Sequence, residues 1–292
     1  MLHTRPLGAG APSVSAIGYG GMHLSLADRP TESDAIRVVH AALDHGVTLL
    51  DTADVYCLDD ADIGHNERLL AKALASWNGT RDGVLVATKA GMVRPGGRWE
   101  RDGRPAHIRR ACERSLRALG VDTIGLYQLH APDPAVPFAD SVGAFRQLQD
   151  EGKVRHVGLS NVSVPEIEEA RAIAPIASVQ NRLSPFFREA VETGVVDRCT
   201  QLGIGFIAYS PVGGGRLNLK LPAHDVAAAF GERHGATAHQ IVLAWGLAQG
   251  PTVIPIPSAR TPEHALDSIR AAAITLSPDE LAAIDRARFS RS

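Results

Sequence analysis

The chain has 292 residues, of which 45% are hydrophobic and 21% are charged, and its formal net charge is −2. This length and composition suit a single large α/β domain over residues 1–292. The balanced charge gives no electrostatic reason to expect nucleic acid or a membrane surface as a partner, and no apolar run approaches the ~18 residues of a membrane span. The N-terminus lacks the features of a secretory signal, so we expect a cytoplasmic protein. Nothing in the sequence indicates the oligomeric state.

Short apolar runs alternate with longer amphipathic segments. The runs lie at residues 14–20, 47–51, 83–89, 124–130, 154–160, 177–181, 203–210 and 252–256. Helical periodicity covers residues 33–46, 106–120, 138–152, 164–173, 189–203 and 237–249. Eight strand–helix pairs in this length predict a closed (β/α)8 TIM barrel rather than an open doubly wound sheet.

Two further elements are expected outside the repeating units. Residues 4–15 have Gly and Pro at their centre and predict an N-terminal β-hairpin that caps the barrel floor. Residues 277–289 begin with a Ser N-cap followed three residues later by Glu, which predicts an extra C-terminal helix.

The three cysteines, Cys57, Cys112 and Cys199, are scattered along the chain. They are too few for a disulfide framework or a four-ligand zinc site, so we expect reduced thiols and no bound metal. Cys57 follows a tyrosine of interest, and thiol modification there could affect activity; a passive cysteine is the simpler interpretation.

The C-terminal ends of the predicted strands carry polar side chains, and in (β/α)8 barrels active sites lie at these ends. Three successive strands end in Asp51, Lys89 and His130. Because a buried charge is costly unless it is paired, we expect Asp51 and Lys89 to be neighbours in the barrel mouth, with Tyr56 in the following loop placed over both. Each residue alone has an ordinary structural explanation, but the four together favour an active site.

The motifs at these positions resemble those of a known family. "GVTLLDTADVY", "LVATK", "YQLH", "VGLSN", "SVQN" and "YSPVGGG" are similar to the successive motifs of the aldo-keto reductase superfamily, in the same order. The resemblance implies a metal-independent reductase that transfers hydride from a nicotinamide cofactor to an aldehyde or ketone. It also implies a catalytic tetrad of Asp51, Tyr56, Lys89 and His130.

The residue types agree with this chemistry. Hydride addition to a carbonyl carbon leaves a negative oxygen that must be protonated, and a phenol with a pKa of about 10 is a weak acid. We expect Lys89 to favour tyrosinate and thus to make Tyr56 a better proton donor, while Asp51 keeps the lysine charged. His130 can donate a hydrogen bond to the carbonyl oxygen.

No Gly-x-Gly-x-x-Gly motif opens a helix after a strand, so an extended cofactor across the barrel mouth is favoured over a Rossmann site. By resemblance, Ser160, Asn161 and Gln180 would hold the carboxamide, and Tyr209 would stack on the nicotinamide. Simple packing is the alternative interpretation of Tyr209. The glycines after it either offer backbone N–H groups to a pyrophosphate or form only a flexible loop. The predicted cofactor contacts are Gly21, Met22, Asp51, Ser160, Asn161, Gln180, Tyr209, Ser210, Pro211, Val212, Gly214, Ser258, Arg260, His264, Asp267 and Ser268.

Arg260 suits a 2′-phosphate, since a guanidinium binds phosphate through a bidentate fork, and we therefore prefer NADPH. The sequence departs from the family pattern at Ser258, His264, Asp267 and Ser268, and NADH stays possible.

The substrate side is expected to include Tyr56, His130 and Trp99. Trp99 lies in an Arg- and Gly-rich segment, residues 91–104, which is either a lid whose arginines favour anionic or polar substrates, or a solvated loop.

Two other functions are considered. The first is a cofactor-binding, redox-sensing or regulatory subunit with little turnover. The second is a metal-dependent hydrolase or isomerase with His65, His130, Asp51 and Asp54 as ligands, but these lack a recognisable ligand spacing and Lys89 would repel the ion.

Overall fold

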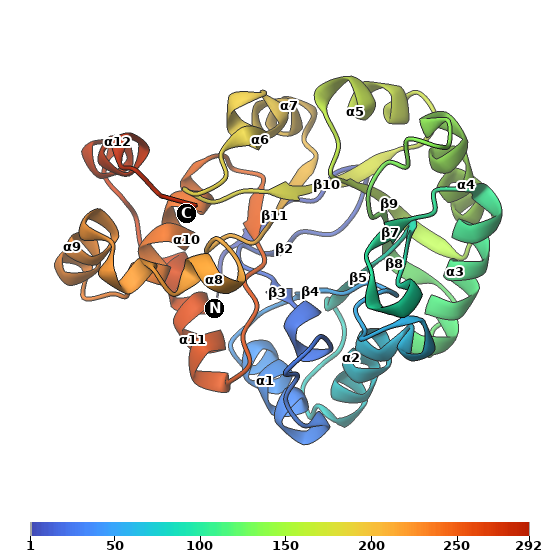
Figure 1. Cartoon of the computed structure of the whole chain (residues 1–292), viewed down its shortest axis with the longest axis horizontal. Helices are drawn as coiled ribbons and strands as arrows, with labels where there is room; N and C mark the ends of the chain where they lie inside the picture. The colour runs from blue at the N-terminus through green and yellow to red at the C-terminus, as the bar shows by residue number, and fades with distance from the viewer. Residues whose placement is uncertain (1, 292) are drawn as a thin grey trace.

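The computed structural model describes residues 2–291 and has a barrel of eight parallel strands at its centre (Figure 1). In sheet order the strands are β3 (Tyr19–Gly20), β4 (Leu49–Asp51), β5 (Leu85–Ala90), β8 (Ile124–Leu129), β9 (Val154–Ser160), β10 (Ile176–Arg182), β11 (Gly205–Tyr209) and β12 (Val253–Pro255). The first and last strands meet through two backbone hydrogen bonds, from Gly18 N to Pro255 O at 2.9 Å and from Gly20 N to Pro257 O at 3.0 Å. The predicted (β/α)8 barrel is confirmed.

Helices surround the strands (Figure 1). They are α1 (Glu32–Asp44), α2 (His65–Ser76), α3 (Pro105–Leu119), α4 (Phe138–Asp150), α5 (Val164–Arg171), α6 (Glu189–Glu192), α7 (Val195–Leu202), α8 (Gly215–Asn218), α9 (Asp225–His234), α10 (Ala238–Ala248), α11 (Pro262–Arg270) and α12 (Pro278–Arg286). The predicted C-terminal helix is α12, and Ser277 and Glu280 form its capping box. Of the helices described, none is long and apolar enough to cross a membrane.

The predicted N-terminal hairpin is present and caps the floor of the barrel. β1 (Thr4–Arg5) pairs antiparallel with β2 (Val14–Ser15). Leu7, between the two strands, packs into the apolar cluster inside the barrel. Arg5 Nη1, from β1, donates to the carbonyl oxygens of Gly250 and Val253. The hairpin therefore closes the end of the barrel opposite the mouth.

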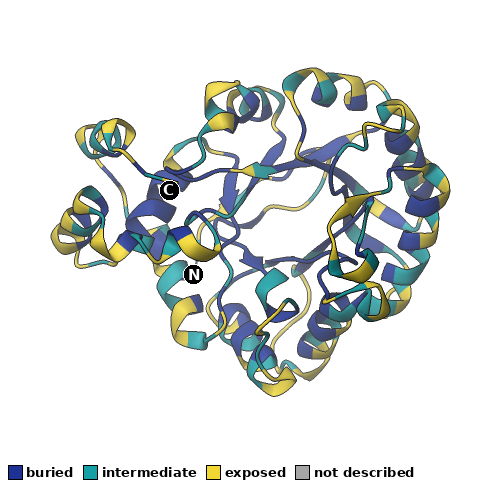
Figure 2. Ribbon diagram, in the orientation of Figure 1, coloured by how far each residue is buried: buried dark blue, intermediate teal, exposed yellow. Residues whose placement is uncertain are grey.

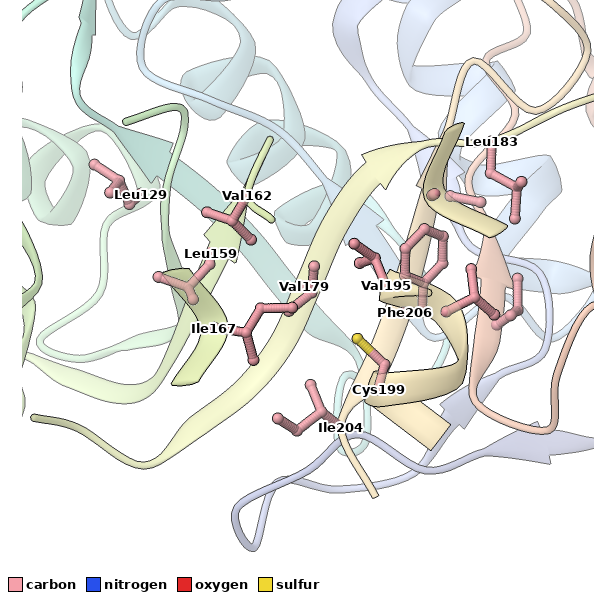
Figure 3. Packing of buried hydrophobic residues seen from close by; sticks show 14 of the residues in the cluster. Leu129, Leu159, Val162, Ile167, Val179, Leu183, Val195, Cys199, Ile204 and Phe206 are labelled. Atoms are coloured by element: carbon pink, nitrogen blue, oxygen red, sulfur yellow. The ribbon is translucent and has the colours of Figure 1, made fainter. Parts of the chain in front are cut away.

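The barrel strands are buried on both faces, as parallel sheets usually are (Figure 2). An outer apolar layer joins the strands to the helices; Figure 3 shows Leu159, Val179 and Phe206 packed against side chains of α5 and α7. The barrel interior is filled by Leu7, Val14, Leu49, Leu85, Ala87, Leu126, Ala177, Ile207, Ile254 and Ile256. Because this filling is apolar, the polar side chains of the strands gather above it, at the mouth.

Three sequence predictions differ from the structure, and several helices were not predicted. The run 14–20 is not one strand: Ser15 Oγ donates to Ile17 O at 2.7 Å, and the bend leaves residues 14–15 in the hairpin and 19–20 in the barrel. The helix expected at 189–203 is split into α6 and α7 at Gly194, whose φ is +76°. The segment 91–104 is not all loop, since β6 (Met92–Val93) pairs with β7 (Glu100–Arg101). Helices α2, α8, α9 and α11 lie outside the segments in which helical periodicity is expected.

Candidate active site

Asp51 and Lys89 form an ion pair at the barrel mouth. Asp51 is the last residue of β4, and Lys89 lies one residue before the end of β5. Lys89 Nζ donates to Asp51 Oδ1 at 2.6 Å, with side chains that are 0% and 2% exposed. The second carboxylate oxygen, Oδ2, accepts from Gln180 Nε2 at 2.7 Å. The carboxylate is thus paired and hydrogen-bonded on both oxygens, as a buried charge requires.

Lys89 also contacts Tyr56. Its ammonium donates to Asp51, to Thr52 O at 2.8 Å and to the phenolic oxygen of Tyr56 at 3.1 Å. These three acceptors use all three donors of the lysine. Because the phenolic oxygen is an acceptor toward Lys89, its own hydrogen is left for another partner. The loop after β4 therefore brings Tyr56 over the Asp51–Lys89 pair, as the sequence predicts.

The acidity of Tyr56 differs from the expectation. Burial raises the pKa of the Tyr56 phenol well above its usual value of about 10, and the Asp51 charge adds to the rise. Burial also lowers the pKa of Lys89, against the opposing effect of Asp51. Burial and the Asp51 charge therefore oppose the expected shift toward tyrosinate. Tyr56 is held as a neutral phenol, which is the form that carries a proton to give.

His130 lies one residue past the end of β8, and its backbone N–H donates to Ala90 O at 2.8 Å. Burial, together with the nearby Lys89 charge, places the pKa of the imidazole well below its usual value. The ring is therefore neutral and keeps one N–H to donate. Its Nδ1 has no hydrogen-bond partner among residues 2–291. The ring lies edge-to-face with Tyr56, with centroids 5.7 Å apart.

Trp99, from the segment between β6 and β7, closes one side of this group. Its ring centroid lies 6.4 Å from the rings of both Tyr56 and His130, and its side chain is 44% exposed. The Arg94 guanidinium lies 4.0 Å from the Trp99 ring centroid and donates to Leu58 O. A cation–π contact of this kind holds Trp99 toward the mouth. Nε and Nη1 of Arg94 are buried without a partner in the described part of the chain.

The residues expected to hold a carboxamide gather at neighbouring strand ends. Ser160 ends β9, and Gln180 lies in β10 beside it in register. Asn161 Nδ2 donates to His130 O at 2.9 Å, and Asn161 Oδ1 accepts from the Tyr209 hydroxyl at 2.8 Å. These contacts connect the strand ends to one another. Asn161 and Gln180 already use polar atoms within the protein, so the donors are arranged before any ligand binds.

Backbone strain marks the same edge. Only four non-glycine residues of the described chain have positive φ, and Asn161 (+59°) and Ser210 (+50°) directly follow β9 and β11. Such conformations are costly and concentrate at functional sites. After Ser210 come Pro211 and Val212, and then Gly213 and Gly214 with φ of +92° and +74°. Gly213 N already donates to Ser210 O at 2.9 Å, whereas the N–H of Gly214 makes no backbone hydrogen bond within residues 2–291. Gly214 has no side chain of its own to cover this N–H, which suits a phosphate group.

Hydrogen bonds to Asp51 and Asn66 hold the loop after β3 in place. Gly21 N donates to Asp51 O at 2.8 Å, and Asn66 Nδ2 donates to Gly21 O at 2.8 Å. A Cβ on Gly21 would lie 2.7 Å from Asn66 Oδ1, so only glycine fits. Met22 follows in the same loop and packs beside Tyr56. The structure thus brings both predicted residues to the mouth.

The predicted adenine-end residues lie apart from this group, after β12 and on α11. Arg260 is exposed, and its Nη1 reaches only Asp28 O, at 3.3 Å. Asp267 is occupied: it accepts from Thr237 Oγ1 at 3.0 Å and from Gln240 Nε2 at 2.6 Å, which ties α11 to α10. The other predicted residues of this segment are Ser258, His264 and Ser268. Arg260 is therefore available to a ligand, whereas the Asp267 carboxylate already has structural partners.

Sequence reasoning missed Gln128 and Asn66. Gln128 is fully buried on β8, and its Nε2 lies 3.5 Å from Asp51 Oδ2. It precedes His130 by two residues, and that spacing on a strand could have indicated a shared face. Asn66 accepts from Thr52 Oγ1 at 2.6 Å, which supports the segment that binds Lys89.

Two other predictions concern a metal site and Cys57. His65 Nδ1 contacts Ser25 Oγ at 2.7 Å, and no three His, Cys, Asp or Glu side chains of the described residues are grouped to hold a metal ion. The metal-site alternative therefore has no support. Cys57 is buried and its Sγ donates to Val55 O and Asp59 O, while burial raises the pKa of the thiol to about 11. The passive interpretation of Cys57 is favoured.

Comparison with known proteins assigns the family. The model of the Aldo/keto reductase family matches residues 16–288. Similar solved structures include a glycerol dehydrogenase from Gluconobacter oxydans, 28% identical with a TM-score of 0.84 over 97% of this chain and 94% of that one. An aldo/keto reductase from Klebsiella pneumoniae in complex with NADP and acetate is 30% identical, with a TM-score of 0.82 over 98% and 95%. The holo form of an aldo-keto reductase from Bacillus halodurans is 27% identical, with a TM-score of 0.81 over 99% and 98%.

The chain therefore belongs to the aldo/keto reductase family, and it is an NAD(P)H-dependent oxidoreductase that acts on carbonyl compounds.

Proposed function

We propose that this protein reduces aldehydes or ketones to alcohols with NADPH, using Tyr56 as the proton donor. The observation that carries the proposal is the buried chain of contacts from Asp51 through Lys89 to the Tyr56 hydroxyl. NADPH, when bound, supplies the hydride. The protein's own residues hold the carbonyl in place and deliver the proton.

Each residue has one task in this scheme. Tyr56 is a neutral phenol whose hydrogen is free toward the mouth, so it protonates the oxygen as negative charge develops. Lys89 donates to the same phenolic oxygen and stabilises the tyrosinate that remains. Asp51 balances the lysine charge. Neutral His130 donates its N–H to the carbonyl oxygen, which orients the substrate and stabilises the oxyanion.

The donor set at the mouth fits a nicotinamide cofactor. The amide and hydroxyl groups of Ser160, Asn161 and Gln180 match a carboxamide, and the ring of Tyr209 is partly exposed beside them. The exposed Arg260 supports NADPH over NADH, because its guanidinium suits a 2′-phosphate. The NADP complex of the Klebsiella pneumoniae relative agrees with this choice.

Trp99 and Arg94 support a substrate with an aromatic or anionic part. Trp99 borders the space over Tyr56 and His130, and Arg94 has buried donors without partners. The comparisons give no support to the regulatory alternative. We also propose a cytoplasmic location, which the three buried free cysteines of the described chain support.

The test follows NADPH absorbance with a panel of aldehydes, ketones and quinones, for the wild type and Tyr56→Phe. We expect the variant to bind NADPH as the wild type does and to reduce carbonyls at least about a hundredfold more slowly, because general acid catalysis is lost. Full turnover by Tyr56→Phe would contradict the assigned role. An activity that a metal chelator abolishes and that does not require NADPH would contradict the proposed reaction.

A further inference from the structure

A second group of buried polar side chains lies behind Lys89. Neighbouring residues of a strand point to opposite faces, so Thr88 meets α2 while Lys89 enters the barrel. Thr88 Oγ1 donates to Glu67 Oε1 at 2.6 Å. The group consists of Asp54 in the loop after β4, Glu67 on α2, Arg114 and Ser115 on α3, and Tyr127 on β8.

This group contains more negative charge than it can neutralise. Asp54 and Glu67 are both 0% exposed. Neither oxygen of Asp54, nor Oε2 of Glu67, has a hydrogen-bond partner within residues 2–291. Arg114 pairs with Asp54, with Nη2 3.6 Å from Asp54 Oδ2, and its side chain is 37% exposed, so water screens it. Two buried carboxylates with one half-solvated cation cannot both ionise at low cost.

The two carboxyl groups differ in their surroundings. Burial raises the pKa of Asp54 well above its usual value and the neighbouring Glu67 charge raises it further, against the smaller opposing effects of Arg114 and the Val55 backbone. Burial also raises the pKa of Glu67, but the short hydrogen bond from the Thr88 hydroxyl opposes the rise, with smaller help from Ser115, Arg114 and Arg68. Donation to a carboxylate favours its charged form. Asp54 is therefore the member that keeps its proton, and Glu67 is the member that ionises.

The charge on this group acts on Lys89. Burial lowers the pKa of Lys89, and the carboxyl groups around it, Asp51 first, oppose the fall when they are ionised. With Asp54 neutral, Asp51 and Glu67 are the two that carry negative charge. Asp51 contacts the lysine directly, whereas Glu67 acts from the other side of β5. We propose that Glu67 is a positioning residue whose single negative charge, beside a neutral Asp54, holds Lys89 as a cation under Tyr56. The importance of this charge for turnover rests on the proposed function, since the task of Lys89 belongs to it.

The positive charges near Asp54 and Glu67 offset the effect of the Glu67 charge on Lys89 only weakly. Arg68 is exposed and Arg114 is partly exposed, so both are screened by solvent. The titratable and charged groups that face the two carboxyls are Cys57, Arg68, Lys89, Arg114 and Tyr127.

The direct test is a pH titration of Lys89 by NMR of protein labelled at lysine Cε. The chain has only four lysines, Lys72, Lys89, Lys153 and Lys220, and Lys89→Met identifies the resonance. We expect Glu67→Gln to lower the Lys89 midpoint by about one pH unit or more, as loss of a nearby opposite charge does. Glu67→Asp, which keeps the charge, and Asp54→Asn, which mimics the neutral acid, should leave the midpoint near that of the wild type. The Lys153 resonance is the internal control.

Turnover gives a second readout. In Glu67→Gln the alkaline limb of turnover against pH should move to lower pH together with the NMR midpoint, while the KM for NADPH stays unchanged. If Glu67→Gln does not fold, Thr88→Val removes the hydrogen bond that favours the Glu67 carboxylate and should shift the Lys89 midpoint in the same direction, by less. An unmoved midpoint in whichever of these variants folds would overturn the proposal, as would an equal shift in Asp54→Asn.

Stability against pH tests the neutral state of Asp54. An acid whose pKa is higher in the folded than in the unfolded state contributes stability that falls as pH rises above its unfolded value of about 3.9. Asp54→Asn cannot ionise and therefore does not have this loss. The melting temperature of the variant, relative to that of the wild type, should rise as pH increases from about 4 to 7. Parallel curves would show an ionised Asp54 and would overturn the proposal. The melting and NMR experiments need no turnover, so the failure of this inference and the failure of the proposed function can be distinguished.

Discussion

The two ends of the proposed cofactor path differ in how their polar groups are used. At the mouth, Lys89 donates to three acceptors, and Asp51 is bound on both oxygens, within a fully buried network. After β12, Arg260 is exposed with one long contact, and Asp267 is bound by α10. The difference indicates that the buried, hydrogen-bonded groups hold the residues proposed to deliver the proton in fixed positions. The adenine end is left to surface contacts, whose loss should affect affinity alone.

Lys89→Met should have the largest effect on the mouth. Removal of the cation leaves Asp51 buried without a counter-ion, which costs about 3–5 kcal/mol of unfolding free energy. Turnover should fall by about 10²–10⁴-fold, because Tyr56 loses its partner. Urea denaturation and steady-state kinetics measure the two effects. The control is Lys72→Met: Lys72 pairs with Glu32 on the surface at 2.7 Å, and its loss should cost at most about 1 kcal/mol. Equal effects of the two substitutions would contradict this account of the mouth.

Gln180→Leu should have a smaller effect at the same end. It removes the 2.7 Å hydrogen bond to Asp51, and a hydrogen bond to a charged group contributes about 1.5–3 kcal/mol. Urea denaturation should show this loss, with turnover reduced less than in Lys89→Met. The exposed Gln147→Leu is the control and should stay within about 0.5 kcal/mol of the wild type. An unchanged stability of Gln180→Leu would mean that the Asp51 network is not rigid.

Arg260→Ala tests the other end and should have the smallest effect. The KM for NADPH should rise about tenfold, the equivalent of ~1.4 kcal/mol, because one charged hydrogen bond to phosphate is lost. Turnover at saturating NADPH and the KM for NADH should not change, since NADH has no 2′-phosphate. Arg171→Ala, on the surface of α5, is the matched control. A parallel rise in the KM for NADH would contradict the assignment to the 2′-phosphate.

The sequence predicted contacts best where the order of the strands determines which residues are neighbours. Asp51 and Lys89 come from neighbouring strands, so their contact follows from strand order and the cost of an unpaired buried charge. The sign of the Tyr56 pKa shift could not be predicted, because it depends on how completely water is excluded. The partners of Asp267 come from the preceding helix, and no local pattern indicates them. The buried pair of Asp54 and Glu67 was missed for the same reason.

The central claim is hydride transfer from NADPH with the proton supplied by Tyr56. The most direct measurement uses NADPH with deuterium at both C4 positions of the nicotinamide, with an aldehyde as substrate and mass spectrometry of the product. We predict an alcohol with one deuterium on the former carbonyl carbon, formed at least about a hundredfold more slowly by Tyr56→Phe. An alcohol without deuterium, or the same rate of labelling in the two proteins, would contradict it.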